Sequence, residues 1–299
     1  MGIFDNPKLK PYLIVSKRGN MNVFKVAFRS LADIELYLNS NPPINSRVFV
    51  SEKSITAKEA FAGEPLEKAI EYCVRGYDKG FEGFLKLQRE LDSVNVKTNF
   101  GRKVTTSVVG ARPNVPAYIA GAPKNMYRVD RVSEKKLIHI YMNLAYSRFT
   151  TEEQIINRGL LVLNLIRLLE ENNYMVDFQV FETCVVENET FICEILLKQP
   201  GTLLDTRKCY YPLCGKAFVR RVITRIKETM PFEGNWHFSY GTVLNTIQTR
   251  IVMNIPEDAI LINSPGEMGI QGDDIYKDAD AFFEILGLKK HIAIPRYSG

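Results

Sequence analysis

Long apolar runs are absent from this 299-residue sequence: 45% of its residues are hydrophobic, yet no stretch approaches the roughly 18 apolar residues of a membrane-spanning helix. The first ten residues also lack the apolar stretch of a secretory signal. With 24% charged residues, the composition is that of an ordinary globular protein, and the length is sufficient for two domains. We therefore expect a cytoplasmic protein that does not bind a membrane.

Cysteine and histidine are few, and they do not form a zinc-binding pattern. The cysteines lie at unrelated spacings, two of them in apolar strand-like runs, so we expect reduced and mostly buried thiols. Cys209 and Cys214 are the one close pair, but a zinc site generally draws on a second Cys or His pair, which the scattered histidines do not supply. These residues are Cys73, Cys184, Cys193, Cys209, Cys214, His139, His237 and His291.

Catalytic motifs are scarce as well, and no Walker-type glycine-rich phosphate loop occurs. Glu194 and Lys198 lie four residues apart in a predicted strand, so both side chains are expected on one face. This pair resembles the acid and lysine of restriction-type nucleases, where the spacing is two. Catalysis is not expected, but a metal-dependent nuclease stays open as an alternative.

Two further side chains have a functional and a structural interpretation. His139 lies inside the apolar run 137–142, where we expect a core histidine, with a general base as the alternative. Trp236 and His237 could stack on a nucleic-acid base, although aromatic residues beside an apolar strand are usually part of the core.

Charge is distributed unevenly along the chain. Residues 1–134 carry 21 basic and 14 acidic residues, a net charge of +7, whereas residues 135–299 carry 18 and 20, a net charge of −2. The basic excess is concentrated in an extended, proline-containing connector over 97–134. Such a connector can contact a phosphate backbone, with a solvated surface strip as the alternative. Its candidate contact residues are Lys97, Arg102, Lys103, Arg112, Lys124, Arg128 and Arg131.

The N-terminal region, 1–96, has the pattern of a smaller mixed α+β unit. Its first fifty residues are rich in strand-like runs, interrupted by Asn41-Pro42-Pro43. Residues 56–91 have apolar residues at helical spacing, and Gly76 and Gly80 indicate two helices there. The expected strands are 11–16, 22–28 and 47–51. In the connector that follows, the prolines are expected to prevent regular helix.

The C-terminal region, 135–299, has the pattern of an α/β fold. A buried strand over 137–142 is followed by a helix to about residue 171 that is apolar on more than one side, with Thr150 and Glu153 as a capping box. Residues 174–186 and 190–198 form an antiparallel hairpin because their connection is short. A strand over 259–262 and a helix over 278–286 complete a Rossmann-like sheet with helices on both faces.

Residues 213–230 have helical spacing between the hairpin and the last strand, and Pro231 ends this pattern. Its basic residues are expected on the outer face of the helix. Three of them, Arg220, Arg221 and Arg225, complete the candidate phosphate contacts.

The order of strand, polar loop, buried helix and hairpin in this region resembles the von Willebrand factor A family. In that family an Asp-x-Ser-x-Ser loop, a threonine after the hairpin and an aspartate after the fourth strand bind a divalent ion. The matching positions here lack both carboxylates, so the resemblance implies a degenerate site with at most weak magnesium binding at Ser147, Thr202 and Asp205. The matching residues are Asn143, Ala145, Ser147, Thr202 with its neighbour Asp205, Asn263 and Ser264.

Most of residues 60–230 also resemble an uncharacterised set of proteins from tailed bacteriophages and mobile elements. The resemblance depends on ARPNVPAYIAGAPKNM at 111–126, on Arg158-Gly159-Leu160-Leu161, on Leu168-Leu169-Glu170 with Tyr174, and on Arg220-Arg221. It implies a phage or mobile-element origin in a bacterial host cell, without an activity to transfer.

Two classes of function follow. The first is a non-enzymatic binding protein of a nucleoprotein or virion-related assembly, which contacts a protein partner through the loops 143–149, 201–207 and 263–269. The second is a sequence-nonspecific RNA- or DNA-binding protein that uses the basic connector. The partner is a protein or a nucleic acid, and assembly into a homo-oligomer stays open.

Overall fold

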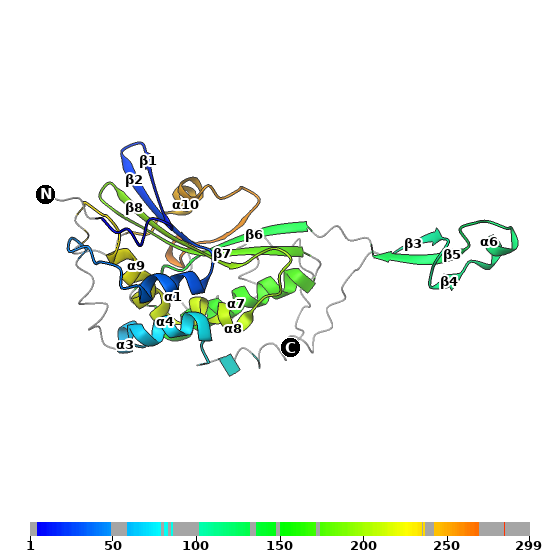
Figure 1. Ribbon diagram of the computed structural model, residues 1–299, viewed down its shortest axis with the longest axis horizontal. Coiled ribbons are helices and arrows are strands. Elements are labelled where there is room, and N and C mark those ends of the chain that lie inside the picture. Colours follow the sequence, from blue (N-terminus) through cyan, green and yellow to red (C-terminus); the bar gives the residue numbers. More distant parts are fainter. Residues whose placement is uncertain are drawn as a thin grey trace.

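The structure, a computed structural model, describes residues 5–48, 59–78, 81–82, 85, 102–131, 136–147, 150–171, 174–234, 236, 242–268 and 284. It is an α/β structure with a six-stranded mixed sheet and a separate three-stranded sheet (Figure 1). The predicted helix over 278–286 lies outside the described residues, apart from Glu284. None of the helices in the described part is both long enough and apolar enough to cross a bilayer.

The six-stranded sheet has the order β1-β2-β8-β7-β6-β9. β6 is parallel to both β7 and β9, β7 and β8 form an antiparallel hairpin, and β8 is parallel to β2. The predicted strand and the predicted hairpin are confirmed as β6 and as β7 with β8. The burial predicted for the strand holds only in its second half, because Leu137 near its start is 46% exposed. The bounds are β1 Leu13–Arg18, β2 Met21–Phe28, β6 Lys136–Asn143, β7 Tyr174–Val186, β8 Glu189–Lys198 and β9 Ile260–Ile262.

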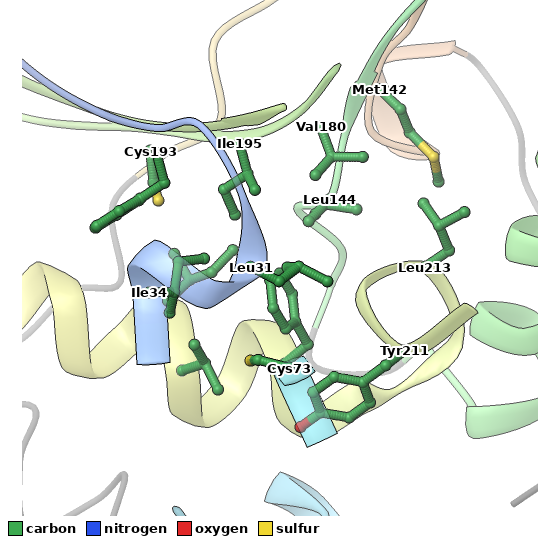
Figure 2. Close-up of a cluster of buried hydrophobic side chains, with 14 of the residues drawn as sticks. Leu31, Ile34, Cys73, Met142, Leu144, Val180, Cys193, Ile195, Tyr211 and Leu213 are labelled. Atoms are coloured by element: carbon green, nitrogen blue, oxygen red, sulfur yellow. The ribbon is translucent and has the colours of Figure 1, made fainter. Parts of the chain in front are cut away.

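The N-terminal region belongs to the same sheet and core as the C-terminal region. β1 and β2 pair antiparallel, and β2 then pairs with β8 over seven residues, Asn22–Phe28. Leu31 and Ile34 from the N-terminal region belong to the same buried apolar cluster as Cys193 and Ile195 of β8 and Tyr211, and Figure 2 shows part of this cluster. The two regions therefore share one hydrophobic core. We call the six-stranded sheet, this core and the helices that cover the sheet the body.

Helix α1, Leu31–Asn39, is an element that sequence reasoning missed. Its signals were present: Ser30 accepts a hydrogen bond from the Asp33 amide as an N-cap, and buried residues follow at helical spacing. The strand-rich surroundings hid this pattern. The predicted strand at 47–51 falls mostly outside the described residues.

The remaining helices of the body cover both faces of the sheet. α7 is long and buried on most sides, as predicted, but its cap lies one residue later than expected, because Thr151 and Gln154 exchange the two capping hydrogen bonds. The single predicted helix over 213–230 is divided between α8 and the pair η1 and α9. The bounds are α3 Glu59–Ala62, α4 Leu66–Arg75, α7 Glu152–Glu171, α8 Thr206–Cys214, η1 Phe218–Ile223 (π-helical), α9 Thr224–Glu228, α10 Thr246–Met253 and η3 Gly266–Met268.

Two apolar clusters stabilise the body, one on each face of the sheet. The larger contains α1, α4, α7 and α8 against alternate residues of the strands, such as Val180 and Cys193. The smaller joins Phe181 and Ile192 to Met253 of α10. Since neighbouring strand residues point to opposite faces, this alternation confirms that the central strands are covered on both sides.

Residues 102–131 form a small unit that we call the arm. Its sheet has the order β3-β5-β4, and Figure 1 shows it apart from the body. The prediction of an extended segment is confirmed except for one helical turn and a half, α6. Pro116 lies in the first turn of α6, where its missing amide hydrogen breaks no helical bond. The bounds are β3 Arg102–Ser107, β4 Arg112–Pro113, α6 Val115–Ile119 and β5 Met126–Arg131.

Candidate functional site

The carboxyl ends of the parallel strands β6 and β9 bring together four of the predicted site residues. The side-chain amide of Asn143 donates to Oδ1 of Asn263 at 2.8 Å, and both side chains are buried. Oδ1 of Asn143 accepts from the Ala145 amide at 3.0 Å, and Oδ1 of Asn263 accepts from the Ser264 amide at 2.8 Å. The polar atoms at these strand ends are therefore used in bonds to one another.

Arg158 of α7 lies at the same place, and sequence reasoning gave it no role there. Its side chain is buried, and Nη2 donates to the main-chain carbonyls of Asn143 at 2.8 Å and Asn263 at 2.7 Å. A charged group bonded to two carbonyls stabilises both strand ends. An arginine within a predicted apolar helix was the signal that could have identified it.

The close approach of α7 and α8 at this point requires glycine. A Cβ on Gly159 would lie 2.4 Å from Sγ of Cys214 and 2.8 Å from the carbonyl oxygen of Leu213. The cavity that remains beside Arg158 has a volume of about 10 Å³ and is lined by Leu144, Tyr146 and Leu213 among others. Such a volume admits a single water and no larger ligand.

The other predicted magnesium ligands do not join this cluster. In the strand register, Lys198 at the end of β8 is opposite Phe178 of β7, whereas Asn143 is opposite Phe181. The loop after β8 therefore begins nearer to the other end of the sheet than Asn143 does. Thr202 donates to the Gln199 carbonyl there, and Asp205 is the N-cap of α8. Ser147 is exposed beyond β6. The three residues therefore do not converge, and the loop 201–207 is separated from the other two predicted loops.

Thr202 and Asp205 line a separate hollow of about 330 Å³ between the starts of α1 and α8. Its buried lysine, Lys198, is paired with Glu170 at 2.7 Å. The two helix starts are capped by their own residues, Ser30 and Asp205. In the described part of this hollow, the capping groups and the buried charge are thus already satisfied.

The nuclease-like pair is not on one face of β8. Lys198 is opposite Phe178, but Leu196 is opposite Gln179, so Leu197 is an additional residue in a β-bulge. The bulge reverses the alternation, and Lys198 points to the α7 side while Glu194 points to the other side and pairs with Lys25. The prediction of a shared face was wrong because a bulge adds one residue to the period of two.

The histidine and tryptophan candidates have structural partners. His139 is only half-buried, and its Nδ1 lies 2.9 Å from Oδ2 of Asp177 on the neighbouring strand. The prediction of a core histidine is therefore wrong in part. Trp236 is fully buried, stacks on Phe232 at 4.1 Å and donates to Glu189 at 2.7 Å. Its core assignment is confirmed, whereas His237 lies outside the described residues.

The five cysteines are buried and unbonded to one another, as predicted. Burial raises the pKa of Cys209 to about 12 and that of Cys214 well above its ordinary value. Their thiols point to different carbonyls, those of Leu197 and Ile156. Because zinc binds thiolates, this pair is unsuited to the metal at neutral pH. Among the residues with a described placement, no three His, Cys, Asp or Glu side chains are grouped to hold a metal ion.

A buried ion pair in the body was not predicted from the sequence. Nζ of Lys227 lies 3.1 Å from Oε1 of Glu182, and both side chains are almost completely buried. Burial alone would lower the pKa of Lys227, but the neighbouring Cys184 and Glu182 raise it above its ordinary value. Lys227 therefore belongs to the core, where Glu182 is its partner.

The basic outer face expected for residues 213–230 is not present. Arg221 is 3% exposed and donates to the Gly63 carbonyl, and Arg225 pairs with the buried Glu228 at 3.0 Å. Arg220 bonds to the Phe61 carbonyl and lies over the Phe61 and Tyr146 rings. All three arginines were predicted to contact phosphates. Instead, Arg220 and Arg221 attach α3 and the residue that follows it to the body, and Arg225 pairs within α9. The helical spacing was correct, and the choice of the outer face was wrong.

The arm differs from these sites because the basic side chains that the structure describes there are exposed. Arg112, Lys124 and Arg128 are exposed, and the backbones of Arg102, Lys103 and Arg131 lie in the same sheet. The side chains of these last three residues, and all of Lys97, lie outside the described residues. The segment 102–131 has six basic residues and one acidic residue, a net charge of +5, and the rest of the chain has 33 of each.

The arm also lacks a core in its described part. None of the residues 106–128 is buried. Its apolar side chains are largely in solvent, including Val109 at 76%, Ile119 at 80% and Tyr118 at 69%. A three-stranded sheet normally needs a covered apolar face to be stable. The arm therefore has the properties of a binding surface.

Comparison with known proteins identifies the family of the chain. The domain of unknown function DUF7192 matches residues 9–290, so the chain belongs to this family. No curated protein matches the chain. No solved structure matches it either.

Proposed function

We propose that this DUF7192 protein is a non-enzymatic nucleic-acid-binding protein whose arm contacts the phosphate backbone. The observation that carries the proposal is the charge of the arm: it equals the net charge of the whole chain, while the remainder is neutral. A surface with several exposed cations and few acids attracts a polyanion and releases its counterions on binding. The residues that bind are Arg112, Lys124 and Arg128, together with Arg102, Lys103 and Arg131.

The body supports this function as a scaffold. Among its described residues, several arginines and lysines are engaged in internal bonds, as in the pairs of Lys227 with Glu182 and Arg225 with Glu228. Such groups gain little from a phosphate, because they would have to leave a partner. The arm is thus favoured over the helix face of residues 213–230.

The test is the salt dependence of binding to a labelled oligonucleotide, measured by fluorescence anisotropy. If all six cations of the arm contact phosphates of a single strand, the plot of log K against log salt has a slope of about −4. A slope near zero, or no binding at low salt, would contradict the proposal. By comparison, binding through an apolar interface that contacts no phosphates has an affinity that barely responds to salt.

A finer proposal concerns the fold of the body. We propose that β6, α7, β7, β8 and β9 form a von Willebrand factor A-like unit in which Arg158 acts where relatives hold a divalent ion. Support comes from β6 between its parallel neighbours β7 and β9, and from the antiparallel β8 beyond β7. A further cation beside Arg158 would be repelled by the guanidinium. The sheet differs from that family in one respect. Its hairpin of β7 and β8 is not at the sheet edge, because β2 and β1 follow β8 in the strand order.

A protein partner in a nucleoprotein or virion-related assembly is the second candidate, favoured by the exposed Val109 and Ile119 of the arm. Copurification from expressing cells at low and high salt separates the two. A nucleic acid is lost as salt rises, whereas a protein held by apolar contacts stays bound. Phage or mobile-element origin and a cytoplasmic location in a bacterial host remain predictions.

A further inference from the structure

One face of the arm carries a row of three side chains across its strands. In the register of the sheet, Tyr127 of β5 is opposite Thr106 of β3 on one side and opposite Arg112 of β4 on the other. Directly opposed residues of antiparallel strands point to the same face, with Cβ atoms about 5 Å apart. The row therefore places an aromatic ring between a hydroxyl and a guanidinium.

The position of β4 is fixed by a close backbone approach. The Ala111 amide donates to the Tyr127 carbonyl at 2.9 Å, and the Asn114 amide donates to the Asn125 carbonyl at 2.7 Å. A Cβ on Gly110 would lie 2.3 Å from the Tyr127 carbonyl oxygen, so only glycine permits this path. The chain thus holds Arg112 beside Tyr127 through backbone bonds instead of through a core.

The row is open to solvent. Thr106, Arg112 and Tyr127 are exposed, with Tyr127 at 38%. A tyrosine held by its backbone on a bare sheet, with cations around it, can receive an unpaired base on its ring while the phosphates lie among the cations. An intact duplex cannot use such a ring, because its bases are already stacked on one another.

The helix of the arm does not offer the alternative of duplex reading. α6 has five residues, so its length is about 8 Å. Recognition helices place several side chains along the major groove, which requires a longer element. Charge attracts any nucleic acid to the arm, but its geometry suits an unpaired strand.

We infer that the arm binds single-stranded RNA or DNA, with one base stacked on Tyr127 and the guanidinium of Arg112 against the adjoining phosphate or base. This inference deepens the proposed function and rests on it. The ligand chemistry is an unpaired base attached to a phosphodiester, which both RNA and DNA supply. Thr106 is close enough to donate a hydrogen bond to a sugar or phosphate oxygen. The affinities of the protein for oligo(U) and for oligo(dT) distinguish RNA from DNA as the source.

The test uses the full chain with labelled oligo(U), oligo(dT) and a duplex of about 12 nucleotides, within the range of known single-strand sites. The variant Tyr127→Leu keeps the charge and an apolar side chain but removes the ring. Its affinity for the single strands should fall about tenfold with an unchanged salt slope, and its affinity for the duplex should stay as it was. Preference of the wild-type protein for oligo(U) or for oligo(dT) identifies the source.

Two matched variants control for folding and for general aromatic effects. Tyr127→Phe keeps the ring and should bind single strands as the wild-type protein does. Tyr118→Leu removes a more exposed tyrosine of the same arm, in α6, and should change the affinity less than about twofold. Unaltered far-ultraviolet circular dichroism of each variant excludes loss of the arm sheet as the cause.

The outcomes separate this inference from the proposed function. If Tyr127→Leu binds single strands like the wild-type protein, or if the duplex binds as tightly as the single strands, the stacking inference is overturned while salt-dependent binding survives. If the wild-type protein binds no oligonucleotide at low salt, both fail. A selective, tenfold loss for Tyr127→Leu that Tyr127→Phe does not show is the supporting result.

Discussion

The body and the arm use basic residues in opposite ways. In the body, several arginines and lysines are held inside the structure, as Arg158 is by two carbonyls and Lys227 by Glu182. In the arm, Arg112 and Lys124 are exposed on a sheet without a buried residue over 106–128. The same residue types are therefore buried with partners in one region and exposed to solvent in the other.

This comparison shows that net charge per segment is less informative than the partners of each charge. Residues 213–230 carry many basic side chains, but Arg221 and Arg225 are bonded within the body. A buried charge is retained only with partners, whereas an exposed charge costs little and remains free to contact an external anion. The following predictions test whether the two regions differ in this way.

Arg158→Met should have the largest effect on stability. It removes two charge-assisted hydrogen bonds and leaves the buried carbonyls of Asn143 and Asn263 without them, so we expect a loss of about 4 kcal/mol in the free energy of unfolding. Urea unfolding followed by the fluorescence of Trp236, the one tryptophan, measures it. Arg167→Met in the same helix, where the arginine pairs with Glu171 near the surface, should cost less than about 1 kcal/mol. Equal losses would contradict the account.

Replacing three exposed cations of the arm by alanine (Arg112, Lys124 and Arg128) should weaken oligonucleotide binding by about two orders of magnitude at low salt. The slope of log K against log salt should become less steep by about 2, because three phosphate contacts are lost.

The matched control for this triple variant removes three exposed cations of the body, Lys17, Arg29 and Lys68. It changes the net charge by the same amount and should leave the affinity within about threefold of the wild-type value. A control variant that binds as weakly as the arm variant would mean that overall charge, not the arm, determines binding.

Tyr37→Phe should cost about 2 kcal/mol, because the buried hydroxyl pairs with Thr229 at 2.5 Å and accepts from Asn6 at 3.0 Å. Burial raises the pKa of Tyr37 to about 12 from an ordinary value of 10.0. The folded state thus favours the neutral phenol, so this stabilisation is complete below pH 10 and is lost as the pH rises through 12. The difference in stability between the wild-type protein and Tyr37→Phe should therefore narrow over this range.

Tyr12→Phe is the control for that measurement, since its ring lies 5.7 Å from that of Tyr37 in the same aromatic cluster. It should cost less than about 0.5 kcal/mol. A difference between the wild-type protein and Tyr37→Phe that stays constant from pH 10 to 12 would contradict the assignment.

Replacing residues 102–131 by a short glycine-serine linker should have only a small effect on the stability of the body. The strand pairing of the arm is internal, and the strands of the body pair among themselves. The free energy of unfolding of the body should change by less than about 1 kcal/mol, while oligonucleotide binding disappears. A large loss of body stability would mean that the arm is a structural part of the body.

The sequence predicted the body well where a pattern was local. The apolar run of β6, the short turn between β7 and β8, and the apolar circumference of α7 each determine an element through neighbouring residues. It failed where the outcome depends on distant partners. Only the tertiary structure brings β2 beside β8, and only a bulge at Leu197 turns Lys198 away from Glu194.

The candidate site was predicted in part for the same reason. The resemblance to the von Willebrand factor A family predicted that Asn143 and Asn263 belong to one site, and the structure joins them by a hydrogen bond. Arg158 could not be assigned there without the path of α7 above the sheet. In the arm, the basic pattern was visible in the sequence, but the opposition of Arg112 and Tyr127 depends on a register that three prolines and a glycine turn obscure.

Hydrogen exchange of the full chain, with and without a single-stranded oligonucleotide at low salt, tests the central claim most directly. The account predicts that peptides within residues 102–131 gain protection on binding and that peptides of β6, α7, β7 and β8 keep the protection they had. Protection that appears instead around the strand ends of Asn143 and Asn263, or in residues 213–230, with none in the arm, would contradict it.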